Sequence, residues 1–141
     1  MDQPITETLN VSNGLSEVER ANDVLRELWS RCALPEDLEV PVTMCLEEVL
    51  SNVIRHGCVG ITDCRIQVLY RTLPGGIEVE VSDNGKAFDP LKLPPPDLNL
   101  PLEQRRAGGL GVFLVRQMMD EVHYDYRNGR NHFLFRKRWP A

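Results

Sequence analysis

Two tight hairpins constrain the fold of this chain more than any other feature of its sequence. Residues 65–72 and 77–82 alternate apolar and polar side chains, and Pro74-Gly75-Gly76 between them is a turn sequence. A second hairpin is predicted near the C-terminus, where Asn128-Gly129 separates two more alternating segments. A hairpin joins antiparallel strands, so we expect a mostly antiparallel sheet.

Three segments have the spacing of amphipathic helices. The first follows the capping-box sequence at residues 16–19. Pro41 suits the first turn of the second helix, which is predicted to run to about His56, and the third helix spans residues 110–119. With a further strand at residues 5–11, this order predicts an α+β fold: a two-layer sandwich in which a mixed, mostly antiparallel sheet is covered on one face by three helices.

Size and composition indicate one globular domain spanning residues 1–141. Of the 141 residues, 42% are hydrophobic and 26% are charged, which is ordinary for a folded domain. No apolar run is long enough to span a bilayer, and the polar start, MDQPITETLN, lacks the apolar core of a signal peptide. We therefore expect a cytoplasmic protein with no membrane association.

Charge is distributed unevenly along the chain. Residues 1–50 hold 11 acidic and 3 basic side chains, a net charge of −8, whereas residues 51–141 hold 10 acidic and 13 basic ones, a net charge of +3. The acidic half argues against a nucleic-acid partner. It is compatible both with a basic protein partner and with a solvated helical surface.

The four cysteines include no Cys-x-x-Cys pair, which argues against a zinc site. Cys32, Cys45, Cys58 and Cys64 are therefore expected to be reduced and to act as small apolar side chains. The alternative is a metal cluster of the last two with His56, but their spacing fits no standard site.

The second predicted helix carries three polar side chains at intervals of four residues, Glu48, Asn52 and His56. This interval is close to one helical turn, so the three side chains are expected along one stripe at the rim of the core. A carboxylate there can act as a general base toward a hydroxyl group, and an amide oxygen can ligate magnesium. Taken alone, the pattern is more typical of a polar helix face without a functional role.

Asp83 ends a predicted strand, and Gly85 follows two residues later. The carboxylate is expected at the edge of the sheet, where it can accept a hydrogen bond from the exocyclic amino group of adenine; guanine has no amino group at that position. The glycine allows the backbone to approach a flat ligand closely. Taken alone, the segment is also an ordinary Asp-Asn-Gly turn.

Gly108, Gly109 and Gly111 open the third predicted helix, where backbone N–H groups and the helix dipole favour an anion. The segment is neither a Rossmann fingerprint nor a Walker P-loop, because no strand directly precedes it and no Gly-Lys-Ser/Thr sequence follows. Arg105 and Arg106 stand just before the glycines, either to meet phosphate or as solvated loop residues.

The three segments, in this order, resemble the boxes of the ATP-binding domain shared by DNA gyrase, ninety-kilodalton heat-shock chaperones, sensor histidine kinases and mismatch-repair ATPases (the Bergerat fold). CLEEVLSNVIRHG is similar to the N box, VSDNGKAF to the first glycine box and GGLGVFLVRQMMDEV to the second. The short length, the Glu-x-x-x-Asn-x-x-x-His form and the Met-Asp-Glu-Val sequence narrow the resemblance to the anti-sigma-factor serine kinases of bacterial partner switching, over residues 5–138.

The resemblance implies ATP and Mg²⁺ as cofactors and a role for each matching residue. Glu48 is implied as the catalytic base for a serine hydroxyl, Asn52 as the magnesium ligand and Asp83 as the residue that recognises adenine. Residues 86–108 are implied as a lid over the phosphates. The nucleotide-binding residues expected on this basis are Asn52, His56, Asp83, Gly85, Ala87, Phe88, Arg105, Gly108, Gly109, Leu110 and Gly111.

Two positions depart from the family pattern. The second glycine of the first glycine box is replaced by Ala87, which is expected to stiffen the hinge of the lid. The last strand, at residues 131–135, has no Ser or Thr where family members often carry a hydroxyl group near adenine. The sequence therefore predicts no hydroxyl contact to adenine from that strand.

The implied function is an ATP-dependent serine kinase that phosphorylates a small anti-sigma antagonist protein and also binds a sigma factor. A homodimer is suggested by the resemblance alone. Two alternatives stay open: a module that binds ATP and sequesters a partner without catalysis, and the detached catalytic domain of a histidine kinase. Glu48 and Asn52 argue against the first, because a pure binding module needs no base. No phospho-accepting helical hairpin precedes the site, which argues against the second.

Overall fold

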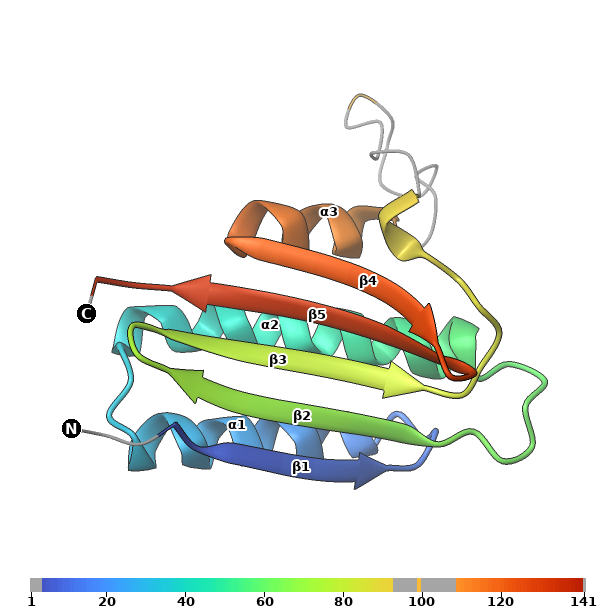
Figure 1. The fold of residues 1–141 in the computed structure, drawn as a ribbon, viewed down its shortest axis with the longest axis horizontal. Helices are drawn as coiled ribbons and strands as arrows, with labels where there is room; N and C mark the ends of the chain where they lie inside the picture. The colour runs from blue at the N-terminus through green and yellow to red at the C-terminus, as the bar shows by residue number, and fades with distance from the viewer. Residues whose placement is uncertain (1–3, 93–98, 100–108, 141) are drawn as a thin grey trace.

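The computed structural model contains a five-stranded sheet with the strand order β1-β2-β3-β5-β4 (Figure 1). It describes residues 4–92, 99 and 109–140. Every pairing between the described strands is antiparallel, so the antiparallel sheet predicted from the hairpins is confirmed and no parallel pair is added to it in this part of the chain. The strands are β1 (Thr6–Val11), β2 (Ile66–Leu73), β3 (Gly76–Asp83), β4 (Glu121–Arg127) and β5 (Arg130–Arg138).

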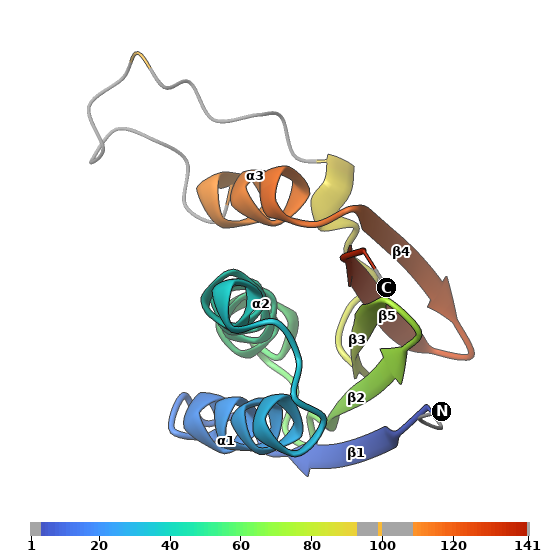
Figure 2. The same cartoon turned by 90° about the vertical axis from the view of Figure 1, so that its left-hand side faces the viewer.

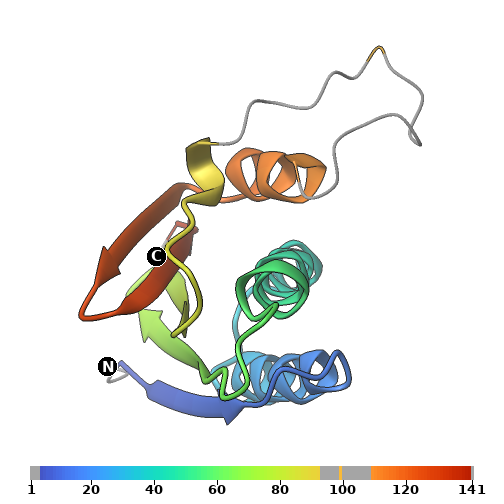
Figure 3. The same ribbon diagram turned by 90° about the vertical axis from the view of Figure 1, so that its right-hand side faces the viewer.

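Three α-helices cover one face of the sheet, which confirms the predicted two-layer α+β sandwich (Figure 2). Seen from the opposite end, α2 lies between α1 and α3, with α1 next to β1 and α3 next to β4 (Figure 3). None of the described helices is long and apolar enough to cross a membrane. The helices are α1 (Glu17–Arg31), α2 (Glu36–Asn52), the π-helical η1 (Val53–Gly57), the 3₁₀-helical η2 (Pro90–Lys92) and α3 (Gly109–Met118).

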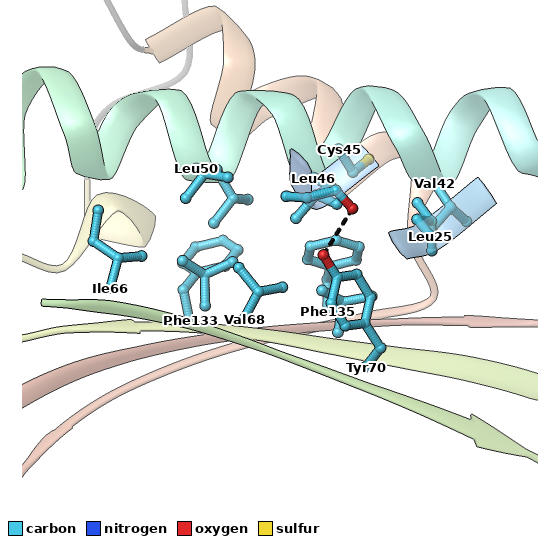
Figure 4. Close-up of a cluster of buried hydrophobic side chains, with 14 of the residues drawn as sticks. Leu25, Val42, Cys45, Leu46, Leu50, Ile66, Val68, Tyr70, Phe133 and Phe135 are labelled. Carbon is cyan, nitrogen blue, oxygen red and sulfur yellow. Dashed lines mark hydrogen bonds between the residues drawn. The ribbon is translucent and has the colours of Figure 1, made fainter. Parts of the chain in front are cut away.

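The hydrophobic core lies between α2 and the inner face of the sheet (Figure 4). Alternate residues of a strand point to the same face, so Val68 and Tyr70 both enter the core from β2 and are fully buried beneath Leu46 and Leu50. Burying one such aliphatic side chain contributes about 1.5–3 kcal/mol. The Tyr70 hydroxyl donates a 2.7 Å hydrogen bond to the carbonyl of Ala21, which ties α1 to the sheet.

Both predicted hairpins form where the sequence places them. In β4–β5, Asn128 and Gly129 have φ angles of 54° and 74°, the left-handed pair that a type I′ turn requires. The short turns set the register of the strands, because a slip of one residue would move every core side chain to the solvent face. β3 and β5 are neighbours in the sheet without a hairpin between them, and there Asn131 of β5 is the direct partner of Asp83 at the end of β3.

The second helix begins earlier than predicted. α2 starts at Glu36, before Pro41, and continues through that proline although a proline gives up one backbone hydrogen bond. Pro35 stands at the N-cap, and Glu36 and Asp37 occupy the first turn, where carboxylates are stabilised by the exposed N–H groups. The acidic run after Pro35 was the better signal for the start of this helix.

The capping box predicted at the start of α1 does not form. Ser16 makes no side-chain hydrogen bond to the helix N-terminus. Instead, the Glu17 carboxylate accepts hydrogen bonds from the backbone N–H of Ser12 at 2.9 Å, from its hydroxyl at 3.0 Å and from Arg20 at 2.8 Å. These bonds, with the Ser12 N–H as the largest cause, lower the pKa of Glu17 to about 2.

Cys58 and Cys64 form a disulfide, which corrects the prediction of four reduced cysteines. Their Cα atoms lie 5.5 Å apart, within the range that a disulfide spans, because η1 ends beside the start of β2. Cysteine connectivity cannot be read from spacing alone, so no sequence pattern marked this pair. Cys32 and Cys45 are free, as predicted, and burial raises the pKa of the Cys45 thiol to about 12.

Candidate functional site

A cleft lies where the three predicted segments meet, between α2, α3 and the ends of β3 and β5. It holds about 520 Å³ of space, part of which is open to solvent. One wall comes from α2, another from α3, and the sheet contributes the floor. The lining residues with polar or aromatic side chains that matter most here are Glu48, Asn52, Asp83, Phe88, Tyr124 and Asn131.

Glu48 lies on the α2 wall with an exposed side chain. Its carboxylate touches Gly111 in the first turns of α3, so closely that a Cβ atom at position 111 would collide with it. Within the described part of the chain, Glu48 forms no ion pair that would compete for its negative charge. An exposed, unpaired carboxylate at a cleft can accept a proton from a hydroxyl group brought to it.

Asn52 lies one turn after Glu48 and lines the same wall, so these two side chains share a stripe as predicted. His56 does not continue the stripe: it is exposed and does not line the cleft. The physical reason is that α2 ends at Asn52 and the next five residues form a π-helix, whose wider turn changes the direction of the following side chains.

Asp83 is the last residue of β3, and its side chain is buried, with 3% of its surface exposed. Its Oδ1 accepts hydrogen bonds from the backbone N–H of Gly85 at 2.8 Å and from Asn131 Nδ2 at 3.1 Å. Oδ2 has no hydrogen-bond partner among the residues that the structure describes. One carboxylate oxygen is thus held by the protein while the other remains to accept a hydrogen bond from a ligand.

Gly85 and Gly57 bring the ends of β3 and η1 into contact beside Asp83. A Cβ atom at position 85 would collide with the backbone carbonyl oxygen of Gly57. A Cβ atom at position 57 would in turn lie 3.5 Å from Asp83 Oδ1. Gly85 therefore allows a close backbone approach that a side chain would prevent, whereas a Cβ atom at position 57 would make an ordinary contact.

The glycine-rich start of α3 is described in part. The helix begins at Gly109, and Gly111 is buried against the α2 wall. The first turn of a helix presents backbone N–H groups and a partial positive charge, which favour an anion. Gly108 and Arg105 lie outside the described residues, as does the side chain of Leu110.

The predicted lid, residues 86–108, is described over residues 86–92 and at residue 99. Phe88 is 49% exposed and lines the cleft, where its ring is available to a flat ligand. Ala87 is also exposed but does not line the cleft. Arg116 of α3 donates a 2.9 Å hydrogen bond to the carbonyl of Leu91, which connects this segment to α3.

Asn131 and Tyr124 are site residues that the sequence analysis missed. Both line the cleft, and the Tyr124 hydroxyl donates to Asn131 Oδ1. The last strand has no Ser or Thr, but an amide can fill the same place. The Asn128-Gly129 turn sets Asn131 opposite Tyr126 of β4, whereas the pairing of Asn131 with Asp83 joins β5 to β3, two strands that no short turn connects, so the sequence pattern contained no signal for it.

Comparison with known proteins settles the family. Residues 11–137 match the family described as Histidine kinase-like ATPase domain. The chain belongs to this family. Serine/threonine-protein kinase BtrW of Bordetella bronchiseptica is 31% identical over 108 residues, which are 77% of this chain and 72% of BtrW. Serine-protein kinase RsbW of Listeria monocytogenes is 37% identical over 98 residues, 67% of this chain and 60% of RsbW.

The relatives differ from this chain in length, and a solved structure supports the fold. The chain spans less than two thirds of the Listeria RsbW that it matches. The structure of the RsbU and RsbW domains of Rv1364c from Mycobacterium tuberculosis aligns with a TM-score of 0.66 at 17% identity, covering 99% of this chain and 34% of the other. The resemblance stated from the sequence boxes is therefore confirmed for the family and the fold.

Proposed function

We propose that this protein is an ATP-dependent serine kinase of bacterial partner switching, acting in the cytoplasm. Its substrate is a serine of a small anti-sigma antagonist protein, and its second partner is a sigma factor. The observation that carries the proposal is the exposed carboxylate of Glu48 at the start of α3, in the same cleft as Asp83. The similarity to BtrW, a serine/threonine-protein kinase, and to RsbW, a serine-protein kinase, supports the activity.

The shape and polarity of the cleft fit an adenine nucleotide. Asp83 offers one carboxylate oxygen for the amino group of adenine, while Phe88 and Tyr124 provide aromatic surface near it. At the other end, Gly111 leaves the start of α3 without a side chain, so the N–H groups of the helix can face phosphate. On the basis of the family resemblance, we propose that the remaining predicted lid residues, up to position 108, cover the phosphates.

Asn52 is the residue that would hold magnesium. It lines the cleft, and its amide oxygen is a hard ligand of the kind that magnesium prefers, with phosphate oxygens and water as the other ligands. When bound, MgATP supplies the phosphoryl group, and the ion neutralises its charge.

Glu48 would act on the substrate's serine. Its carboxylate would accept the hydroxyl proton as the serine oxygen forms its bond to the γ-phosphorus of ATP and the bond from that phosphorus to the bridging oxygen breaks, releasing ADP. The gain in rate would come from holding base and hydroxyl in one geometry. The contact with Gly111 limits where this carboxylate can lie. Its exposure matches a substrate that is a protein, because a serine on a folded partner can reach only a base that is open to solvent.

The acidic surface of the first two helices suits a basic partner. The first turn of α1 carries Glu17 and Glu19, and the first turn of α2 carries Glu36, Asp37 and Glu39. Charge complementarity of this kind mainly raises the rate and specificity of association. We expect binding of the partners to weaken as ionic strength rises.

The test measures transfer of labelled phosphate. Partners are captured from lysate on the protein loaded with MgATP or with MgADP, identified by mass spectrometry, and then used as substrates in single-turnover assays. Glu48→Gln is expected to lower the transfer rate by a factor on the order of 10² to 10⁴ and to retain ATP binding. Glu47→Gln is the matched control, because the neighbouring carboxylate bonds Asn22 of α1 at 2.9 Å instead of lining the cleft.

Other outcomes decide between the alternatives. Undiminished transfer by Glu48→Gln would remove this residue from the proposed role. ATP binding with no phosphoserine on any captured partner would favour a module that only sequesters its partner. An acid-labile phosphohistidine product would favour the catalytic domain of a histidine kinase.

A further inference from the structure

Asn131 connects four groups at the floor of the cleft. Its Nδ2 donates to Asp83 Oδ1 at 3.1 Å and to the carbonyl oxygen of Lys86 at 2.8 Å. Its Oδ1 accepts from the hydroxyl of Tyr124 and from the backbone N–H of Phe88 at 3.1 Å, an N–H that also lies 3.2 Å from the Tyr124 hydroxyl oxygen. Only 6% of its surface is exposed, so these bonds are largely protected from competition by water.

The orientation of this amide is fixed by its neighbours. The N–H of Phe88 can only donate and the carbonyl of Lys86 can only accept, so Oδ1 must face the first and Nδ2 the second. With the amide in this orientation, the second hydrogen of Nδ2 points to Asp83. The carboxylate then has two donors on Oδ1, from Asn131 and Gly85, and these hold it against rotation.

We propose that Asn131 is a positioning residue that fixes Asp83 for recognition of adenine and fastens residues 86–88, here called the lid root, to the same point. The inference rests on the proposed nucleotide site but adds a residue and a coupling to it. Asn131 performs both tasks because its two amide atoms serve different elements: Nδ2 holds the end of β3, and Oδ1 holds the N–H of Phe88.

Base selectivity follows from the fixed carboxylate. With Oδ1 held, Asp83 presents Oδ2 to the ligand, and that oxygen accepts a hydrogen bond from the amino group of adenine. Guanine has a carbonyl oxygen at the corresponding position, which a carboxylate repels. A carboxylate free to rotate would lose part of this discrimination, because it could turn its charge away from the guanine oxygen.

Two variants separate the tasks of the amide. Asn131→Ala removes both the amide oxygen Oδ1 and the amide nitrogen Nδ2. Asn131→Asp has nearly the same shape and keeps an oxygen for the Phe88 N–H, but it replaces the donor to Asp83 by a second carboxylate oxygen. Asn10→Ala is the matched control, because this asparagine lies on the far edge strand β1 and bonds only Gln67 among the described residues.

Two measurements are made on each variant. Isothermal titration calorimetry gives the Kd for MgATP and MgGTP. Hydrogen exchange followed by NMR gives the protection of the Phe88 amide without nucleotide, so this second measurement does not depend on ATP binding. Far-UV circular dichroism confirms the fold of each variant. If Asn131→Ala does not fold, Asn131→Asp carries the test, because it removes the donor to Asp83 with little change of shape.

Asn131→Ala is expected to weaken MgATP binding about tenfold, the size of effect that follows from losing one buried hydrogen bond to a charged group. The Kd for MgGTP should change less, so the ratio of the Kd for MgGTP to the Kd for MgATP falls. The Phe88 amide should exchange faster. Asn131→Asp should weaken MgATP binding more than Asn131→Ala while leaving the Phe88 amide protected. Asn10→Ala should change neither measurement.

Different failures have different meanings. If the wild-type protein binds no adenine nucleotide, the proposed function fails. If the wild type binds MgATP selectively and Asn131→Ala matches it in the ratio of the two constants and in Phe88 exchange, the role of Asn131 is overturned and the nucleotide site stands. A loss of affinity that is equal for MgATP and MgGTP would also overturn the positioning of Asp83.

Discussion

The α-carbon of Gly111 lies against the carboxylate of Glu48, with no room between them for a Cβ atom. The contact joins α3 to α2 at the mouth of the cleft and places the proposed base beside the helix N-terminus that would face phosphate. The contact with Glu48 therefore requires a glycine at position 111 for steric reasons, separately from the proposed contact of this glycine with a nucleotide.

Gly111→Ala is expected to displace the Glu48 carboxylate and leave the fold intact. The atom that a Cβ would meet is the end of a flexible side chain, which can rotate away. Phosphoryl transfer should fall about a hundredfold, because small displacements of a catalytic group have effects of that order. Single-turnover transfer and thermal unfolding, measured on the same preparation, check both parts.

The control for this prediction is a double-mutant cycle. In a Glu48→Ala background, Gly111→Ala should have little further effect on transfer, because the carboxylate that it displaces is already absent. Gly14→Ala, whose Cβ would make an ordinary 3.7 Å contact with Ser16 Oγ, should have no effect in either background. Additive losses would show that Gly111 acts independently of Glu48.

Gly85→Ala is expected to destabilise the protein instead. Here the Cβ atom would meet the backbone carbonyl of Gly57, which cannot rotate away, so the end of β3 or of η1 has to shift. We expect the free energy of unfolding to fall by about 3 kcal/mol, in the range of overpacked core positions. Urea denaturation of Gly85→Ala and Gly14→Ala measures it, and equal midpoints would contradict the close approach described here.

The sequence predicts the sheet better than it predicts the site. Turn residues and alternation sufficed for both hairpins, because a type I′ turn has few alternatives to Asn128-Gly129. The predicted start of α2 is wrong because Pro41 favours the first turn of a helix, whereas α2 accommodates this proline further in. The spacing of Glu48 and Asn52 was sufficient to place both on one wall, since the α-helix is regular as far as Asn52.

What the sequence could not provide depends on contacts between distant segments. His56 leaves the predicted stripe because the helix widens into a π-helix after Asn52, a local change for which the sequence pattern has no marker. The role of Asn131 depends on the strand register that sets it opposite Asp83. Such relationships follow from pairing across the sheet and become visible only in three dimensions.

The disulfide gives a prediction about thiol content. Protein purified without reductant, and then unfolded in denaturant that contains iodoacetamide, should be alkylated at Cys32 and Cys45 only. Reduction before alkylation should make Cys58 and Cys64 reactive as well. Mass spectrometry distinguishes the two states. Reduction should lower the free energy of unfolding by about 2 kcal/mol, because the bond closes a short loop. Four alkylated cysteines without reductant would contradict the bond.

Glu17 gives a prediction about pH. Its folded-state pKa of about 2 lies below the ordinary value of 4.5, so the ionised carboxylate stabilises the fold above pH 4.5. This stabilisation is lost as the pH falls from 4.5 toward 2. Glu17→Gln should therefore lower the Tm at pH 6, and the difference from wild type should shrink across that window. Glu19→Gln, an exposed neighbour, should show no such trend, and a constant difference for Glu17→Gln would contradict the assignment.

The most direct test of the nucleotide site is calorimetric titration of wild type and Asp83→Asn with MgATP and MgADP. Wild type is expected to bind both with one site per chain. Asp83→Asn should bind each at least about tenfold more weakly, because it loses a charged acceptor for the adenine amino group, while Asp125→Asn on the exposed part of β4 should match wild type. Absence of binding by folded wild-type protein at millimolar nucleotide, or equal affinities for wild type and Asp83→Asn, would contradict the account.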